Sequence, residues 1–321
     1  MKSMSTHQRL IIFLVSVLAL TSILSPWFAI AADWLVGQFP GAERYPFSRI
    51  FNRTFMISGI VLFFVCRRLL RIGSLSELGF VSLSQGGGDL LRGWSLAVAS
   101  LAALLLAMSV AEVFEPYFRL SFFRSLSRFF SALLSGVFTG LLEEIFFRGI
   151  LFKGLLQDGR LFRAFVLSSL FYSALHFVRP GQAYFVDGFD PLAGTRHLFY
   201  TFTPFLEPLK ILPGMFGLFL LGMVLSYAFL RTGNLYLAIG LHAGWIFGLK
   251  SVRVFGDYTR DDLGWLFGSS DPKIVSGVAT WIGIASVLVL VHWLTRNRCG
   301  LAGNQTTDLR RVNRGTFNTL C

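Results

Sequence analysis

Hydrophobic residues gather in eight long runs along the chain, and short polar segments separate these runs. Most of the runs approach the roughly 20 apolar residues that a helix needs to cross a bilayer. They cover residues 10–32, 51–66, 94–115, 126–150, 161–178, 209–231, 234–250 and 274–295. This pattern predicts an all-α polytopic membrane protein of about eight transmembrane helices.

Composition supports this fold class. Of the 321 residues, 54% are hydrophobic and only 14% are charged, which is more apolar surface than a soluble fold of this size buries. The net charge of +12 would also suit a protein that binds nucleic acid. Most of the basic residues, however, lie outside the apolar runs. The lipid bilayer, with a basic protein face against anionic lipid, is therefore the expected partner, and nucleic acid is not.

The distribution of charge predicts the orientation in the membrane. If the N-terminus is cytoplasmic, the inner segments carry more Lys and Arg than the outer segments, and the positive-inside rule then places both termini in the cytoplasm. The first run follows Lys2 and Arg9 and ends near Ala29, Ile30 and Ala31, a pattern that a cleaved signal peptide shares. An uncleaved anchor is the preferred interpretation, and cleavage would leave seven spans.

Few ionisable residues interrupt the runs, and each is a candidate for function because charge is costly at membrane depth. Glu143, Glu144 and Arg148 lie in the fourth run, His176 in the fifth and His242 in the seventh. Glu144 and Arg148 have the i, i+4 spacing and the order that favour a helical ion pair. Glu143 then becomes the candidate reactive carboxylate, because burial raises a carboxyl pKa toward the range of general acid–base catalysis.

Helix geometry predicts which side chains meet. If the fourth and fifth runs form a hairpin that turns near residues 158–160, Glu144 lies 160 − 144 = 16 residues before the turn, and His176 lies 176 − 160 = 16 residues after it. At about 1.5 Å per residue, both lie roughly 24 Å from the turn. His242 falls near the middle of its run. A site made of one Glu and two His side chains from three helices, Glu143, His176 and His242, is therefore geometrically reasonable.

These motifs resemble a known family. The segment EEIFFRG matches the EExxxR signature of the CPBP (Abi) family, which includes type II CAAX prenyl endopeptidases and bacteriocin-processing proteins. YSALH, ending at His176, and LHAGW, containing His242, follow in the family's order. Two positions depart from its pattern: Tyr172 stands where Phe is usual, and Ile246 stands where Asn or Asp is usual. The resemblance covers about residues 130–249.

The resemblance implies an eight-helix fold with an intramembrane cavity. It also implies an endopeptidase that cleaves a membrane-associated or prenylated protein or peptide, in what we expect is a bacterial inner membrane. Carried over by position, Glu143 would activate the water, His176 would help to position it or to bind the developing charge, and His242 would help to stabilise the oxyanion. Glu144 and Arg148 would give structural support.

The cofactor and the activity remain open at this stage. Glu143, His176 and His242 are adequate ligands for a catalytic zinc with an open coordination position. The same groups suit a metal-free hydrolysis with glutamate as the base, which is the preferred interpretation. Because Ile246 removes a candidate oxyanion donor, the alternative to an enzyme is a catalytically weakened scaffold that binds a peptide or a membrane partner.

The chain is expected to have three parts. Residues 1–125 would hold the N-terminal transmembrane helices and a cytoplasmic connector, residues 126–250 the protease-like core, and residues 251–321 the last transmembrane helix and a polar tail. The connector, around residues 74–89, contains a Gly triplet and is expected to be flexible.

Overall fold

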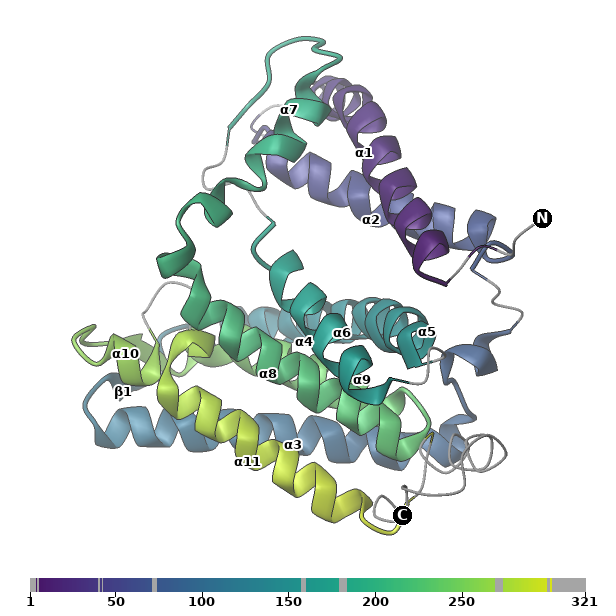
Figure 1. The fold of residues 1–321 in the computed structure, drawn as a ribbon. Helices are drawn as coiled ribbons and strands as arrows, with labels where there is room; N and C mark the ends of the chain where they lie inside the picture. The colour runs from purple at the N-terminus through teal and green to yellow at the C-terminus, as the bar shows by residue number, and fades with distance from the viewer. Residues whose placement is uncertain are drawn as a thin grey trace. The chain divides into compact units, whose positions relative to one another are not determined.

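The computed structural model describes most of the chain, in which nearly all regular structure is helical (Figure 1). This confirms the predicted all-α class. Two residues of the predicted turn near 158–160, residues 158 and 159, lie outside the described residues. Most of the polar tail lies outside them as well. The described residues are 4, 6–39, 41, 43–70, 74–156, 160–178, 184–268, 274–298 and 301.

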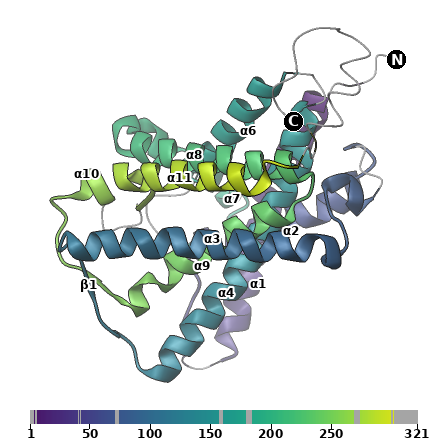
Figure 2. The same ribbon diagram turned by 90° about the horizontal axis from the view of Figure 1, so that it is seen from below.

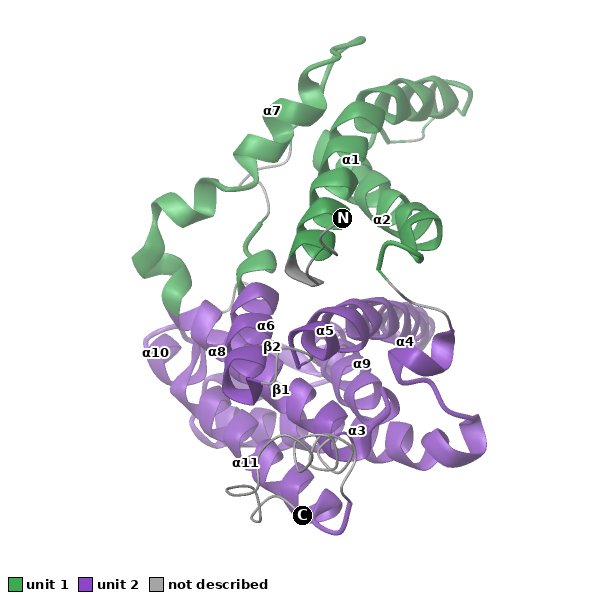
Figure 3. Cartoon of the chain, turned by 45° about the vertical axis from the view of Figure 1, so that its right-hand side comes forward, with its two compact units in different colours: residues 1–73, 174–212 green, residues 74–173, 213–321 purple. Residues whose placement is uncertain are grey.

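The chain forms two compact units, each built from segments that are distant in sequence (Figure 3). Unit 1 contains residues 1–73 and 174–212, and unit 2 contains residues 74–173 and 213–321. The predicted three-part division of the chain stays a prediction beside this description.

Unit 1 is built on two long helices. Its elements are α1 (Thr6–Gly37), α2 (Phe47–Cys66), α7 (Ala193–Tyr200) and η3 (Thr203–Leu206). Both α2 and α7 pack against α1. An aromatic cluster surrounds His197 of α7. The centroid of its ring lies 4.4 Å from that of Phe51 in α2, and its Nδ1 atom lies 2.6 Å from the Tyr184 hydroxyl. Burial lowers the pKa of His197 from 6.5 to about 4.

Unit 2 holds the remaining elements, except that α6 and α8 cross the boundary between the units. A two-stranded antiparallel sheet pairs Phe114 of β1 with Tyr258 of β2. The elements are η1 (Leu75–Leu78), α3 (Leu83–Val110), β1 (Phe114–Pro116), α4 (Phe122–Glu144), η2 (Ile145–Phe152), α5 (Lys153–Leu156), α6 (Leu161–Leu175), α8 (Pro208–Thr232), α9 (Tyr236–Ser251), η4 (Val252–Val254), β2 (Gly256–Tyr258), α10 (Gly264–Phe267), η5 (Ile274–Ser276) and α11 (Val278–Thr295).

Helix α9 is the buried centre of unit 2, and it packs against both α3 and α4 (Figure 2). All of its residues from Leu237 to Trp245 are buried. The approach to α3 is close, because a Cβ atom added at Gly240 would stand 2.1 Å from the carbonyl oxygen of Leu90. Small residues allow helices to pack closely inside a membrane, and here they fix the position of His242.

Among the described residues, six helices are long and apolar enough to cross a membrane. Helices also occur at the other two predicted positions, but α6 has only 15 residues and α9 only 16. At 1.5 Å per residue they fall short of the roughly 30 Å hydrocarbon core. The predicted count of eight spans is therefore not confirmed, whereas the membrane-protein class is supported.

The connector differs from the prediction. Its Gly triplet, residues 86–88, lies in the first turns of α3 and not in a flexible loop. The reason is packing: a Cβ atom at Gly86 would stand 2.3 Å from the ring of Tyr236, so only glycine lets this aromatic side chain lie on α3. The backbone freedom of glycine in isolation predicts a loop, but the tertiary contact favours the helix.

Candidate functional site

The two predicted carboxylates lie where the helix changes its geometry. Helix α4 ends at Glu144, and the chain continues as a π-helix, η2, from Ile145 to Phe152. Such π segments are rare and occur frequently at functional sites. The EExxxR motif therefore straddles a local change of helix type that the sequence pattern did not reveal.

The predicted ion pair between Glu144 and Arg148 is present and fully enclosed. Arg148 Nη1 lies 2.8 Å from Glu144 Oε1, and the two side chains are 1% and 0% exposed. Arg148 Nη2 donates a second hydrogen bond, of 3.2 Å, to the carbonyl oxygen of Gly222 in α8. Its guanidinium also lies 4.8 Å from the ring centre of Tyr172 in α6. Arg148 thus ties three helices of unit 2 together, which agrees with its expected structural role.

Glu144 has a second partner that helical spacing alone did not predict. His242 Nδ1 lies 2.7 Å from the same Oε1 atom that receives Arg148. A carboxylate that is paired with a guanidinium can only accept, so Nδ1 must carry the proton and donate it to Glu144. The carboxylate therefore sets the tautomer and the orientation of the imidazole ring, as second partners of functional histidines commonly do.

The other ring nitrogen of His242, Nε2, faces Glu143 and Tyr172. His242 Nε2 lies 3.7 Å from Glu143 Oε2 and 3.4 Å from the Tyr172 hydroxyl. The Glu143 side chain is 29% exposed, in contrast to the enclosed Glu144. Adjacent residues on a helix point in different directions, and here the two carboxylates approach opposite nitrogens of one imidazole. Glu144 is fully enclosed, whereas Glu143 is partly exposed, although its Oε2 atom is buried.

His176 directly follows α6 and belongs to unit 1, whereas the other predicted site residues belong to unit 2. The expected convergence of His176 on Glu143 therefore stays a prediction. Within the described residues, no three His, Cys, Asp or Glu side chains are grouped so as to hold a metal ion. The proposed zinc ligand set, which requires His176, is not assembled inside one unit.

Position 246 contributes no polar group. Ile246 is half-buried and lies one helical turn beyond His242, on the same side of α9. The neighbouring Trp245 uses its indole N–H in a 3.1 Å hydrogen bond to Ser100 of α3. The departure from the family pattern at Ile246 therefore leaves this turn of α9 apolar.

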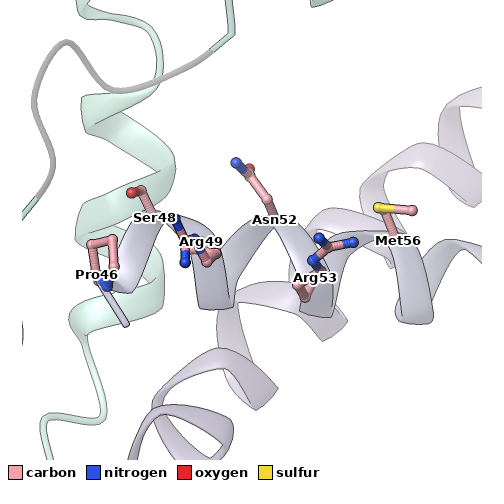
Figure 4. A pocket seen from close by; sticks show the side chains of 6 residues that line it. All are labelled: Pro46, Ser48, Arg49, Asn52, Arg53 and Met56. Carbon is pink, nitrogen blue, oxygen red and sulfur yellow. The ribbon is translucent and has the colours of Figure 1, made fainter. Parts of the chain in front are cut away.

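The predicted polar cavity is not confirmed. One surface hollow, of about 360 Å³, lies along α2 in unit 1, and none of the predicted site residues lines it (Figure 4). Two arginine side chains give it a basic character. It is lined by Pro46, Ser48, Arg49, Asn52, Arg53 and Met56.

Comparison with known proteins bears on these side chains. The family model described as Rce1-like, type II CAAX prenyl endopeptidase Rce1-like, matches residues 124–248. The matched segment runs from α4 to α9 and contains every residue predicted for the site. The match confirms the family resemblance seen in the motifs. No curated protein and no solved structure matches the chain.

The class of protein follows from this match together with the apolar helices. Residues 124–248 are similar to type II CAAX prenyl endopeptidases of the Rce1-like family, which are intramembrane proteases. The long apolar helices among the described residues support an integral membrane protein.

Proposed function

We propose that this protein is an intramembrane endopeptidase that hydrolyses a peptide bond of a prenylated or otherwise membrane-associated protein, with Glu143 as the base. One observation carries the proposal: the partly exposed side chain of Glu143 places Oε2 at 3.7 Å from the Nε2 atom of a histidine whose other nitrogen is held by a buried carboxylate. This arrangement supplies a base and an oriented imidazole side by side.

In the proposed reaction, a water molecule attacks the scissile carbonyl carbon while Glu143 takes one of its protons. The carbonyl oxygen becomes the oxyanion of a tetrahedral intermediate. The intermediate collapses when the carbon–nitrogen bond breaks, and the protonated Glu143 returns its proton to the leaving amine. Proton transfer by a positioned side chain contributes roughly 10²- to 10⁴-fold to such a rate.

His242 would stabilise the developing charge. Because Nδ1–H is bound to Glu144, the Nε2 atom can donate only when the ring is an imidazolium, so Nε2 would have to take up a second proton from bulk water before the attack. Glu144 stabilises that cation at 2.7 Å, and an ion pair in low dielectric is much stronger than in water. The buried carboxylate would therefore act through His242, in addition to its ion pair with Arg148.

His176 would help to position the water, as the family resemblance implies. We favour the metal-free route, because every step above uses a side chain of this protein. If zinc were required, Glu143, His176 and His242 would be its ligands.

We also propose that the protein lies in a bacterial inner membrane with both termini in the cytoplasm. The asymmetric distribution of Lys and Arg supports this orientation. Fusing a reporter that is active only in the cytoplasm to the C-terminus tests it. Activity of the fusion supports the proposal, and silence with normal expression contradicts it.

The function is tested by cleavage of synthetic peptides in proteoliposomes, with products identified by mass spectrometry. A farnesylated C-terminal peptide and the same peptide without the lipid should differ, with cleavage of the lipidated one. Glu143→Gln should abolish cleavage and keep the fold. Glu115→Gln, at an exposed carboxylate in β1, is the matched control and should cleave normally.

The alternative function, a binding scaffold, makes the opposite prediction. A scaffold would retain the peptide without cutting it, and Glu143→Gln would bind the peptide as well as the wild type does. That result would replace the enzyme proposal.

A further inference from the structure

We propose that the Tyr172 hydroxyl is a second hydrogen-bond donor to the oxyanion of the tetrahedral intermediate. This inference rests on the proposed function and adds a residue that the family pattern does not supply, because Phe is usual at this position. The hydroxyl is the chemical difference between the two residues. The hydroxyl lies beside His242 Nε2.

The position of Tyr172 is fixed by its ring. The residue is 2% exposed, and its ring meets that of Phe147 edge-on with centroids 5.0 Å apart. The Arg148 guanidinium lies over the ring at 4.8 Å from its centroid, within the range of a cation–π interaction. These ring contacts do not use the hydroxyl, so they hold the side chain in place whether the oxygen is present or not.

The hydroxyl lies 3.4 Å from His242 Nε2, which in turn is 3.7 Å from Glu143 Oε2. The first distance is longer than that of an optimal hydrogen bond. Catalytic hydrogen bonds are often long before substrate binds and shorten in the complex. The Tyr172 hydroxyl and the Glu143 carboxylate, the proposed base, thus both lie near the same nitrogen of His242.

The Tyr172 hydroxyl carries its own proton and needs no proton from another group in order to donate. Before substrate binds, its nearest polar partner is His242 Nε2, at 3.4 Å. An oxyanion is a charged acceptor, and hydrogen bonds to charged acceptors are stronger than those to neutral ones. The Tyr172 O–H would therefore donate to the oxyanion once the carbonyl oxygen gains negative charge, and the proton would stay on Tyr172.

Several other donors near His242 are engaged, although the buried Arg148 Nε has no hydrogen-bond partner. Arg148 Nη1 donates to Glu144 and Nη2 donates to Gly222. The Trp245 N–H donates to Ser100, and Ile246 has no donor to offer. The geometry therefore favours Tyr172 as the side chain that completes an oxyanion site with His242.

The test is the Tyr172→Phe variant, which removes one oxygen and keeps the ring. Loss of one oxyanion donor lowers kcat by about 10²- to 10³-fold, and we expect that loss in kcat with KM unchanged. Affinity for a phosphinate analogue of the tetrahedral intermediate should fall by a similar factor, because such analogues report transition-state binding. The thermal midpoint should stay close to that of the wild type.

Tyr227→Phe is the matched control. It removes another Tyr–His hydrogen bond, the 2.6 Å contact with His292 Nδ1, outside the site, and should leave kcat unchanged. The inference is overturned if Tyr172→Phe retains the wild-type kcat, or if its loss appears in KM and thermal stability and not in analogue affinity.

The outcome separates the two proposals. A wild type that cleaves, a Glu143→Gln variant that does not, and a fully active Tyr172→Phe variant would overturn the role of Tyr172 alone. A wild type that does not cleave, or a Glu143→Gln variant that cleaves normally, would overturn the proposed function and the role of Tyr172 with it.

Discussion

Replacing Glu144 by Gln should cost both stability and activity, in contrast to the same change at Glu143. Glu144 Oε1 receives Arg148 Nη1 at 2.8 Å and His242 Nδ1 at 2.7 Å, and its side chain is 0% exposed. Removing one partner of a buried ion pair destabilises a protein by about 3–5 kcal/mol, because the other charge is left uncompensated. We expect a loss of this size for Glu144→Gln.

Glu143 gives the internal comparison. Its side chain is 29% exposed and its nearest His242 atom is 3.7 Å away, so Glu143→Gln should destabilise the protein much less than Glu144→Gln. Both variants should be impaired in cleavage, but for different reasons. Glu143→Gln loses the base, and Glu144→Gln loses the carboxylate that orients His242 and stabilises its imidazolium.

A double variant isolates the two roles of Glu144. Adding Arg148→Gln to Glu144→Gln removes both members of the buried pair, and replacing a whole pair with neutral groups is often far less costly than breaking it. Most of the lost stability should return, whereas activity should stay low because His242 still lacks its anionic partner.

The assay is thermal unfolding in detergent, followed by tryptophan fluorescence, beside peptide cleavage in proteoliposomes. The reasoning is refuted if Glu144→Gln melts as the wild type does. It is also refuted if the double variant melts no higher than Glu144→Gln.

Three further predictions concern the fold. Gly240→Ala should prevent normal folding or cost several kcal/mol of stability, because its Cβ would stand 2.1 Å from a backbone oxygen of α3. Gly283→Ala is the control: its Cβ would meet nothing within 4 Å, so this variant should be neutral in the same expression and melting assays. Lowering the pH from 6.5 to 4 should destabilise unit 1 by up to about 3 kcal/mol. In this range His197 takes up a proton in the unfolded chain but not in the folded unit, where its pKa is about 4. The melting temperature of His197→Gln should lack this part of the pH dependence. Asp89→Asn should lower stability by about 1–3 kcal/mol, since both Asp89 oxygens accept hydrogen bonds from Arg298, at 2.9 and 2.7 Å, and an equal melting temperature for this variant would contradict the expectation.

The sequence predicted the parts of the site that depend on one helix. The i, i+4 spacing of Glu144 and Arg148 was enough to predict their ion pair, because helix geometry is local. The separation of Glu143 from Glu144 also followed from that geometry. Apolar runs predicted the helical class and the approximate position of each helix.

The pattern of apolar and polar residues could not predict contacts between helices. The bond from His242 to Glu144 depends on how closely α9 approaches α4, and that approach is set by packing over many residues. The π-helix after Glu144 has no simple sequence signal, and the contact of Tyr172 with His242 looked like ordinary packing. The exact length of each helix was also beyond the pattern. The apolar runs at 161–178 and 234–250 form helices that are too short to cross the hydrocarbon core of a bilayer.

The central claim is that the carboxylate of Glu143 is the base, and single-turnover cleavage of a lipidated peptide tests it most directly. The rate constant of Glu143→Gln should fall by at least about 10²-fold, with an unchanged melting temperature, while Glu115→Gln keeps the wild-type rate. A folded Glu143→Gln variant that cleaves at the wild-type rate would contradict the account.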